Sequence, residues 1–161
     1  MRQLFAPWRF AYVTHAGASQ QCVLCAAVGG GEDTLTLARG ERAFALLNRF
    51  PYTSGHAMVA PVAHVADLSQ LDAATLSEMM SLLQRIVRAL TQVYQPHGFN
   101  IGFNLGEAAG AGIADHLHLH VVPRWRGDTN FMAVTADVRV IPEELTETRA
   151  KLRRALEAPD G

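Results

Sequence analysis

The chain contains 161 residues, of which 49% are hydrophobic and 18% are charged. This balance is typical of one folded domain and excludes an intrinsically disordered chain. The net charge is -1, and a nearly neutral chain is not expected to bind nucleic acid through bulk electrostatics. No hydrophobic segment approaches the roughly 20 residues needed to cross a membrane. We therefore expect a cytoplasmic protein with neither a nucleic-acid nor a membrane partner.

The order of hydrophobic and turn-forming segments predicts a single α+β domain over residues 1–161, built on a mainly antiparallel five-stranded sheet. Residues 1–33 are expected to form an irregular N-terminal extension. The predicted strands are 35–38, 43–48, 56–62, 100–105 and 116–122. Hydrophobic residues recurring every three or four positions predict one long helix that begins after Asp72 and ends before Pro96. Pro142 opens a C-terminal helix at 143–158.

The most informative stretch carries three histidines at alternate positions, His116, His118 and His120. Alternate residues of a strand share one face, so the three imidazoles are expected on the same side of the sheet. Core packing does not explain them, because a buried imidazole needs a polar partner and gains little from burial. A metal site and covalent catalysis by one histidine are the two functional explanations, and a polar strand face that happens to carry histidines is the structural alternative. A catalytic metal centre made of all three is disfavoured, because nearly parallel side chains converge poorly on one ion.

A glycine- and alanine-rich loop at 106–112 comes directly before these histidines. Such a loop can bring backbone N–H groups close to an anion, because few side chains stand in the way. Its position indicates a phosphate held against an imidazole.

The run His-Leu-His-Leu-His-Val-Val at 116–122 resembles the signature of the histidine triad (HIT) superfamily of nucleotide hydrolases and transferases. Two accompanying segments also look like this family: the Asn…Gly-His…Pro pattern within 48–61 and the Asn-Leu-Gly sequence at 104–106. The resemblance covers about residues 20–125. The tail at 123–132 is most similar to the bacterial branch that contains diadenosine tetraphosphate phosphorylases and dinucleoside polyphosphate hydrolases. That branch carries a hydroxyl residue in the loop where this chain has Ala111 and Gly112.

The resemblance implies that His118 attacks the α-phosphorus of a nucleotide and forms a covalent nucleotidyl-histidine intermediate, which water or orthophosphate then resolves. It implies that His120 donates a hydrogen bond to the α-phosphate, with His116 as the third catalytic histidine and His56 as a buried support. The other substrate-binding residues that it implies are Asn48, Asn104, Gly110, Ala111 and Gly112. For the two asparagines, the alternative role is to cap a turn or a strand end.

The two cysteines, Cys22 and Cys25, are separated by only two residues, which is too short a loop for a disulfide that stabilises a fold. Metal binding or redox chemistry is the more relevant question for this pair. Some HIT proteins hold a structural zinc with two cysteines and two histidines, and the resemblance implies the set Cys22, Cys25, His64 and His116. Such a set is suited to a closed tetrahedral zinc site. Two ordinary buried thiols are the alternative.

Three functions remain open. The preferred one is cleavage of a dinucleoside polyphosphate such as diadenosine tetraphosphate. The second is hydrolysis of a nucleoside phosphoramidate at the same α-phosphate site. The third is a nucleotide-binding module without catalysis, which would have no need of an unobstructed nucleophile. The resemblance also implies a homodimer whose sheets join edge to edge.

Overall fold

The computed structural model describes residues 22–29, 35–128 and 141–158. The strands in these ranges are β1 (Thr36–Arg39), β2 (Ala43–Leu47), β3 (Ala57–Pro61), β4 (Gly98–Phe103) and β5 (Leu119–Arg124). The α-helices are α2 (Val23–Val28), α3 (Ala73–Tyr94) and α5 (Leu145–Glu157), and the 3-10 helices are η1 (Leu68–Gln70) and η2 (Glu107–Ala109). None of the helices in the described ranges has the length and apolar character required to span a bilayer.

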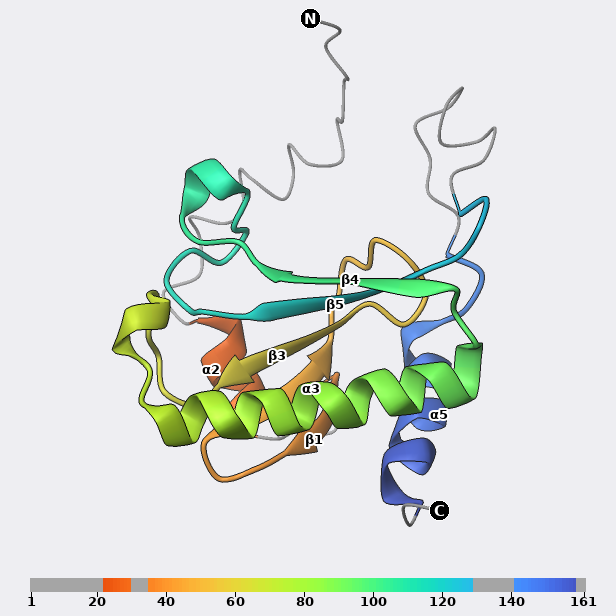
Figure 1. Ribbon diagram of the computed structural model, residues 1–161, viewed down its shortest axis with the longest axis horizontal. Helices are drawn as coiled ribbons and strands as arrows, with labels where there is room; N and C mark the ends of the chain where they lie inside the picture. Colours follow the sequence, from red (N-terminus) through yellow and green to blue (C-terminus); the bar gives the residue numbers. More distant parts are fainter. Residues whose placement is uncertain (1–21, 30–34, 129–140, 159–161) are drawn as a thin grey trace, which may run out of the picture.

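The strands form one sheet in the order β1-β2-β3-β5-β4, and each neighbouring pair is antiparallel. The predicted α+β class and the antiparallel five-stranded sheet are therefore confirmed. β5 comes last in the sequence but lies between β3 and β4 (Figure 1). This insertion leaves β4 at an edge of the sheet and places β5, which carries His120, between two strands.

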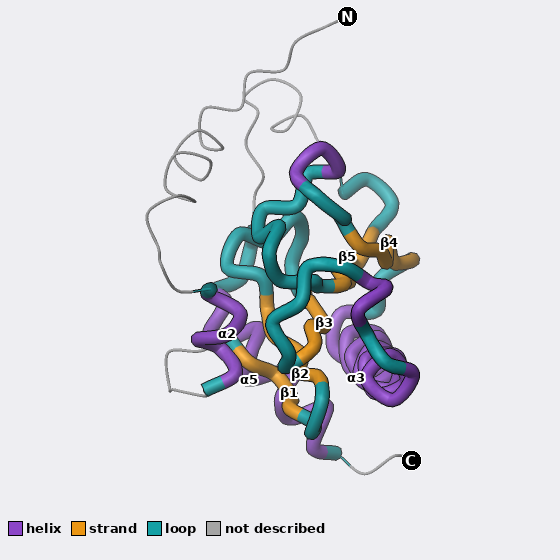
Figure 2. Tube along the Cα trace, turned by 90° about the vertical axis from the view of Figure 1, so that its left-hand side faces the viewer, coloured by secondary structure: helices purple, strands orange, loops and turns teal. Residues whose placement is uncertain are grey.

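Helices cover the two faces of the sheet unequally, with α3 on the opposite side from α2 (Figure 2). The helices α3 and α5 pack against each other and cover the face with the larger hydrophobic core. The buried strand residues on that face are Ala43, Ala45, Leu47, Ala57, Val59, Leu119 and Val121. On the other face, α2 packs Leu24 and Ala27 against Phe44 and Leu46. The histidine site lies on this second face, because His120 is paired with Met58 of the α2 cluster.

The long helix α3 is positioned by its ends and by its buried face. The Asp72 side chain accepts a hydrogen bond from the Thr75 backbone N–H at 2.7 Å, which confirms the predicted N-cap. Gln95 ends the helix in a left-handed conformation with φ 46. Ile86 and Leu90 are almost fully buried, and truncating either to alanine should cost roughly 2–5 kcal/mol. This packing fixes α3 against the face of the sheet opposite the site.

Element boundaries differ from the predictions where tertiary contacts decide them. β4 begins at Gly98, and β5 begins only at Leu119 because its pairing with β4 ends at Phe103. His116 and His118 therefore precede the strand. The helix α2 lies in the segment predicted to be irregular, because packing on the sheet stabilises a short amphipathic helix that propensity alone does not. Residues 1–21 and 30–33 of the predicted extension, and 129–132 of the tail, lie outside the described residues.

Candidate functional site

His118 is held in one tautomer by a backbone contact. The ring is buried, with 5% of its surface exposed, and its Nδ1 lies 2.8 Å from the carbonyl oxygen of His116. A carbonyl only accepts hydrogen bonds, so Nδ1 carries the proton and the neutral ring keeps a lone pair on Nε2. Burial lowers the pKa of His118, which favours this neutral form. His118 can therefore act as a nitrogen nucleophile.

His120 is held in the opposite tautomer by a short relay. The backbone N–H of Tyr52 donates to His56 Nδ1 at 3.1 Å, so the proton of neutral His56 resides on Nε2. His56 Nε2 lies 3.0 Å from His120 Nδ1 and donates to it. The remaining proton of His120 is then on its Nε2. Burial, together with the neighbouring His118, lowers the pKa of His120 to about 4, so that the ring is a neutral donor at physiological pH.

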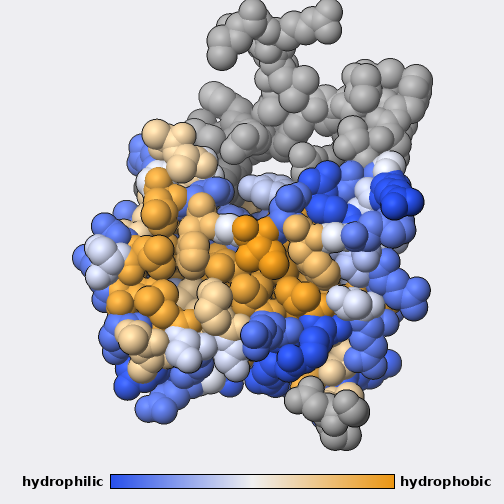
Figure 3. Space-filling model, in the orientation of Figure 1, coloured by the Kyte–Doolittle hydropathy of each residue, from blue (hydrophilic) through white to orange (hydrophobic). Residues whose placement is uncertain are grey.

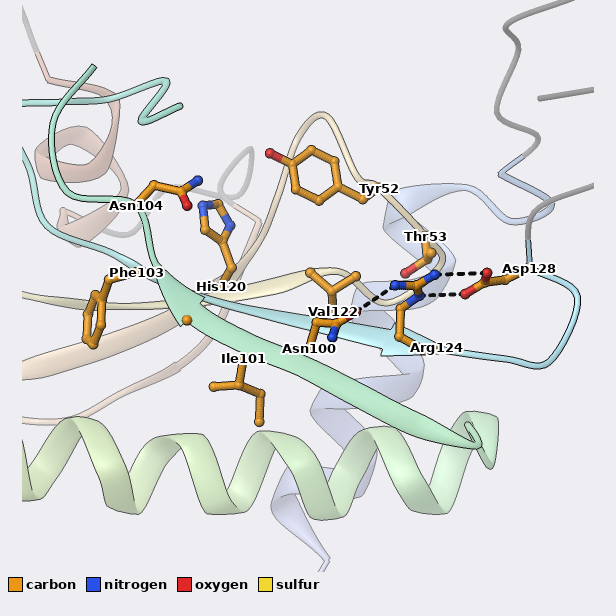
Figure 4. Close-up of a pocket in the computed structure, with 11 residues that line it drawn as sticks. Tyr52, Thr53, Asn100, Ile101, Phe103, Asn104, His120, Val122, Arg124 and Asp128 are labelled. Carbon is orange, nitrogen blue, oxygen red and sulfur yellow. Dashed lines mark hydrogen bonds and ion pairs between the residues drawn. The ribbon is translucent and has the colours of Figure 1, made fainter. Parts of the chain in front are cut away.

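These two rings meet edge to face, with centroids 4.9 Å apart and an interplanar angle of 77°. A lone pair on one ring thus lies beside an N–H donor on the other. Figure 4 shows the side chains of Asn104 and His120 directed toward one another. This arrangement suits attack on a phosphorus atom whose oxygens are bound by the neighbouring donor.

Asn48 and His56 lie together in the connection between β2 and β3. His56 is fully buried, and Asn48 Nδ2 lies 3.5 Å from its Nδ1. Asn48 Oδ1 accepts a hydrogen bond from the Phe50 backbone N–H at 2.9 Å, which is the turn-capping contact of the alternative role. A contact between Asn48 and a ribose stays a prediction.

The glycine loop makes hydrogen bonds within itself. Gly106 and Gly110 have φ values of 78 and 88, which is backbone geometry that favours glycine. The N–H groups of Gly110 and Ala111 donate to Glu107 and Gly106 carbonyls. In this conformation these two N–H groups are used inside the loop. Phosphate binding by residues 110–112 therefore also stays a prediction.

A separate Cys2His2 cluster lies beside the histidine pair. Cys22, Cys25, His64 and His116 each offer one ligand atom, and the four atoms lie within 4.8 Å of one another. The Cys25 Sγ to His64 Nδ1 distance is 3.2 Å, and the Cys22 Sγ to His116 Nδ1 distance is 3.4 Å. Ligand atoms of a tetrahedral zinc site with these donors are roughly 3.5 Å apart. The predicted zinc set is thus brought together with suitable spacing.

The tautomer of His116 fits a metal ligand. Its Nε2 donates to the Pro61 carbonyl oxygen at 2.9 Å, so the lone pair is on Nδ1, the nitrogen that faces the thiols. Burial raises the pKa of the Cys25 thiol, and a metal ion would displace that proton because thiolate is the binding form. The cluster links the α2 segment to the end of β3 and to the residue two positions before His118.

Several contributors to the site were not singled out from the sequence. They include the Tyr52 N–H and the Pro61 carbonyl, which are backbone groups and carry no residue-type signal. A cavity of ≈ 450 Å³ also begins at His120 and continues past Val122 to Arg124. The two-residue alternation of the histidines, continued along β5, would have placed both residues on the same face.

Comparison with known proteins agrees with this geometry. A model of the HIT domain family matches residues 31–127. An AP-4-A phosphorylase of Mycobacterium tuberculosis H37Rv is 38% identical over 161 residues, covering 94% of this chain and 83% of that protein. An uncharacterized 16.1 kDa HIT-like protein of Mycoplasma pneumoniae is 33% identical, covering 71% and 78% respectively.

Solved structures also resemble this one. A Zn-bound histidine triad family protein from Mycobacterium smegmatis has a TM-score of 0.69 and 36% identity, covering 84% of this chain and 93% of that one. A hypothetical histidine triad nucleotide-binding protein from Sulfolobus tokodaii has a TM-score of 0.70 and 23% identity, covering 84% and 92%. The second likeness concerns the fold alone.

Proposed function

Because the chain belongs to the HIT domain family, we propose that it cleaves dinucleoside polyphosphates at the α-phosphate through a nucleotidyl intermediate on His118. It is a HIT-family enzyme of the nucleotide hydrolase or phosphorylase class. The observation that carries the proposal is the pairing of an unprotonated Nε2 on His118 with a protonated Nε2 on His120. The similarity to an AP-4-A phosphorylase supports the substrate class.

The reaction proceeds in two displacements. His118 Nε2 forms a bond to the α-phosphorus, and the bond from that phosphorus to the bridging oxygen breaks, so diadenosine tetraphosphate loses ATP and leaves AMP on the ring. Water or orthophosphate then attacks the same phosphorus, the bond to Nε2 breaks, and AMP or ADP is released. The N–H of His120 donates to the phosphate oxygens as negative charge develops on them.

The remaining site residues have supporting roles in this proposal. Asn104, beside His120, and residues 110–112 contact the α-phosphate, the latter after the loop opens its internal hydrogen bonds. Asn48 contacts the ribose. A zinc ion on Cys22, Cys25, His64 and His116 would be structural, because all four positions of a tetrahedral ion are taken by protein. The ion would hold His116, and through its carbonyl the tautomer of His118.

Brief mixing with diadenosine tetraphosphate, followed by intact mass spectrometry, tests the proposal. We expect a transient adduct of one AMP that is absent from His118→Gln and present in His97→Gln, a matched control because His97 is exposed and not part of the triad. ADP that forms only with orthophosphate identifies a phosphorylase, and AMP in plain buffer identifies a hydrolase. Tight nucleotide binding without adduct or turnover would refute the proposal.

The partner that we propose is a second copy of the chain. β4 is an edge strand, and a hydrophobic surface spreads over β4 and α3 (Figure 3). Ile101 and Leu105 are 46% and 48% exposed there, and Met80 on α3 is 39% exposed. A strand edge that has no partner among the described strands, beside an apolar patch, favours edge-to-edge pairing of two sheets.

A further inference from the structure

A cavity lies beside His120, and Asn48 is not among the residues that line it. It is ≈ 450 Å³ in volume and is formed by β4, β5 and the connection that carries Tyr52 and Thr53 (Figure 4). His120 is the one member of the triad that lines it; Asn48 and the glycine loop do not. A volume of this size is sufficient for a small organic ligand.

The walls of the cavity combine an aromatic face, an apolar floor and a polar end. Tyr52 is 43% exposed, and its ring stacks on that of His120 with centroids 6.0 Å apart and an angle of 29°. Val122 forms the floor between His120 and Arg124 (Figure 4). Along β5, the four residue steps from His120 to Arg124 span roughly 13 Å. That reach accommodates a phosphate followed by a nucleoside.

The polar end is a guanidinium held in one plane. Arg124 Nε and Nη2 donate to the two carboxylate oxygens of Asp128 at 2.6 and 3.0 Å, and Nη1 donates to Asn100 Oδ1 at 2.6 Å. The bidentate contact fixes the orientation of the guanidinium, whose flat face is suited to stacking on a planar ring. An exposed ion pair contributes little to the free energy of unfolding, so stability does not explain why Arg124 and Asp128 are arranged in this way.

The charges at this end favour a neutral ligand group over a further phosphate. Arg124 and Asp128 together carry no net charge, and the Asp128 carboxylate would repel an anion. A planar neutral group with hydrogen-bond donors and acceptors matches the mixture of guanidinium, carboxylate and amide. A nucleobase has this chemistry.

We propose that the cavity holds the leaving nucleotide of the dinucleoside polyphosphate, with its base at the Arg124 end. This inference rests on the proposed function. In an in-line displacement the leaving group departs opposite the nucleophile, and a dinucleotide needs room for a second nucleoside away from the first. In this proposal the first nucleoside lies at Asn48, which does not line the cavity, and the cavity extends from His120 along β4 and β5.

An effect on binding of the leaving nucleotide can be distinguished from an effect on catalysis by comparing two substrates that share the same reacting adenylyl group. Diadenosine tetraphosphate has a nucleotide leaving group, whereas adenosine 5′-phosphoramidate has only ammonia. We define the ratio as kcat/KM for diadenosine tetraphosphate divided by kcat/KM for adenosine 5′-phosphoramidate. We expect Arg124→Met to lower this ratio roughly tenfold, because only diadenosine tetraphosphate reaches the cavity. Arg42→Met is the matched control, since Arg42 pairs with Asp72 at 3.2 Å and is 46% exposed against 44% for Arg124. The control should leave the ratio unchanged.

Val122→Phe provides a second variant, which fills the cavity from its floor without changing charge. It should change the ratio in the same direction as Arg124→Met. An equal fall on both substrates, or no fall on either, would overturn the inference while leaving the proposed function in place. A wild-type enzyme that forms the adduct from the phosphoramidate alone would refute the proposed substrate class and, with it, this inference. Failure of wild-type protein to turn over either compound would refute the proposed function and this inference together.

Discussion

His56 Nε2 and His120 Nδ1 lie 3.0 Å apart although 64 positions separate them in the sequence. The contact depends on the register of β3 and β5, in which Met58 is paired with His120. Because the Tyr52 N–H holds the other nitrogen of His56, a backbone atom in a loop determines which nitrogen of His120 can donate to a substrate. The tautomer of the donor is thus a property of the fold.

Replacing His56 should impair catalysis while leaving substrate binding largely unchanged. His56→Phe keeps a buried planar ring but removes the donor to His120, so we expect kcat to fall roughly 10- to 100-fold with little change in KM. Nitrogen NMR shifts of His120 should show loss of the single tautomer. His56→Gln, which restores an N–H donor, should recover part of the rate. Normal kcat in His56→Phe would contradict the relay.

The stability of the fold should fall as the pH is lowered past the ordinary histidine range. The folded-state pKa of His120 is about 4 and the unfolded value is about 6.5, so between these values the unfolded chain binds more protons. The free energy of unfolding contributed by His120 is therefore complete above about pH 6.5 and is lost toward pH 4, by up to about 3 kcal/mol.

Denaturant unfolding of wild type and His120→Gln across this pH range measures that contribution. The difference between the two proteins should shrink as the pH falls, because the variant lacks the titrating ring. A constant difference from pH 7 to pH 4 would show that His120 titrates normally in the folded protein.

Loss of the metal cluster should destabilise the protein. We expect wild type to bind one zinc per chain and Cys25→Ser to bind less, measured by elemental analysis. Its Tm should fall by roughly 5–10 °C, which corresponds to about 2–3 kcal/mol for a domain of this size. A chelator should lower the Tm of wild type and leave that of Cys25→Ser unchanged. Equal chelator effects on both proteins would argue against this cluster as the zinc site.

A charge on the exposed edge should prevent dimer formation. Ile101 is 46% exposed on β4, and Ile101→Lys would bring like charges together across a symmetric interface. Light scattering should give twice 17.5 kDa for wild type and 17.5 kDa for the variant. Lys151→Ile, on the distant helix α5, is a charge-altering control that should stay dimeric. A wild-type mass of one chain would refute the dimer.

Local sequence signals were sufficient for the elements with strong periodicity or capping. The N-cap at Asp72 and the long helix behind it were predictable because both depend on neighbours within a few residues. The alternate histidines marked the candidate site for the same reason, although only His120 of the three lies within β5.

Other features depend on contacts between distant segments. The helix α2 forms because Phe44 and Leu46 give Leu24 a surface to pack on. The cavity depends on the pairing of Asn100 with Val122 across two strands. The internal hydrogen bonds of the glycine loop join backbone atoms. Such bonds cannot be predicted from residue type, because every residue carries the same backbone carbonyl. Such features require the sheet order, which a single sequence does not reveal.

The place of β5 in the sheet also affects how the chain matures during synthesis. The first three strands are adjacent in both sequence and space, so they can pair as they leave the ribosome, whereas β4 pairs among the described strands only with β5. β4 must wait, unpaired, until residues 119–124 have been made. Since His120 lies within β5 and His118 directly before it, the same segment completes the described sheet and brings both histidines to the candidate site. A nascent chain that lacks this segment therefore has neither the complete described sheet nor an assembled histidine site.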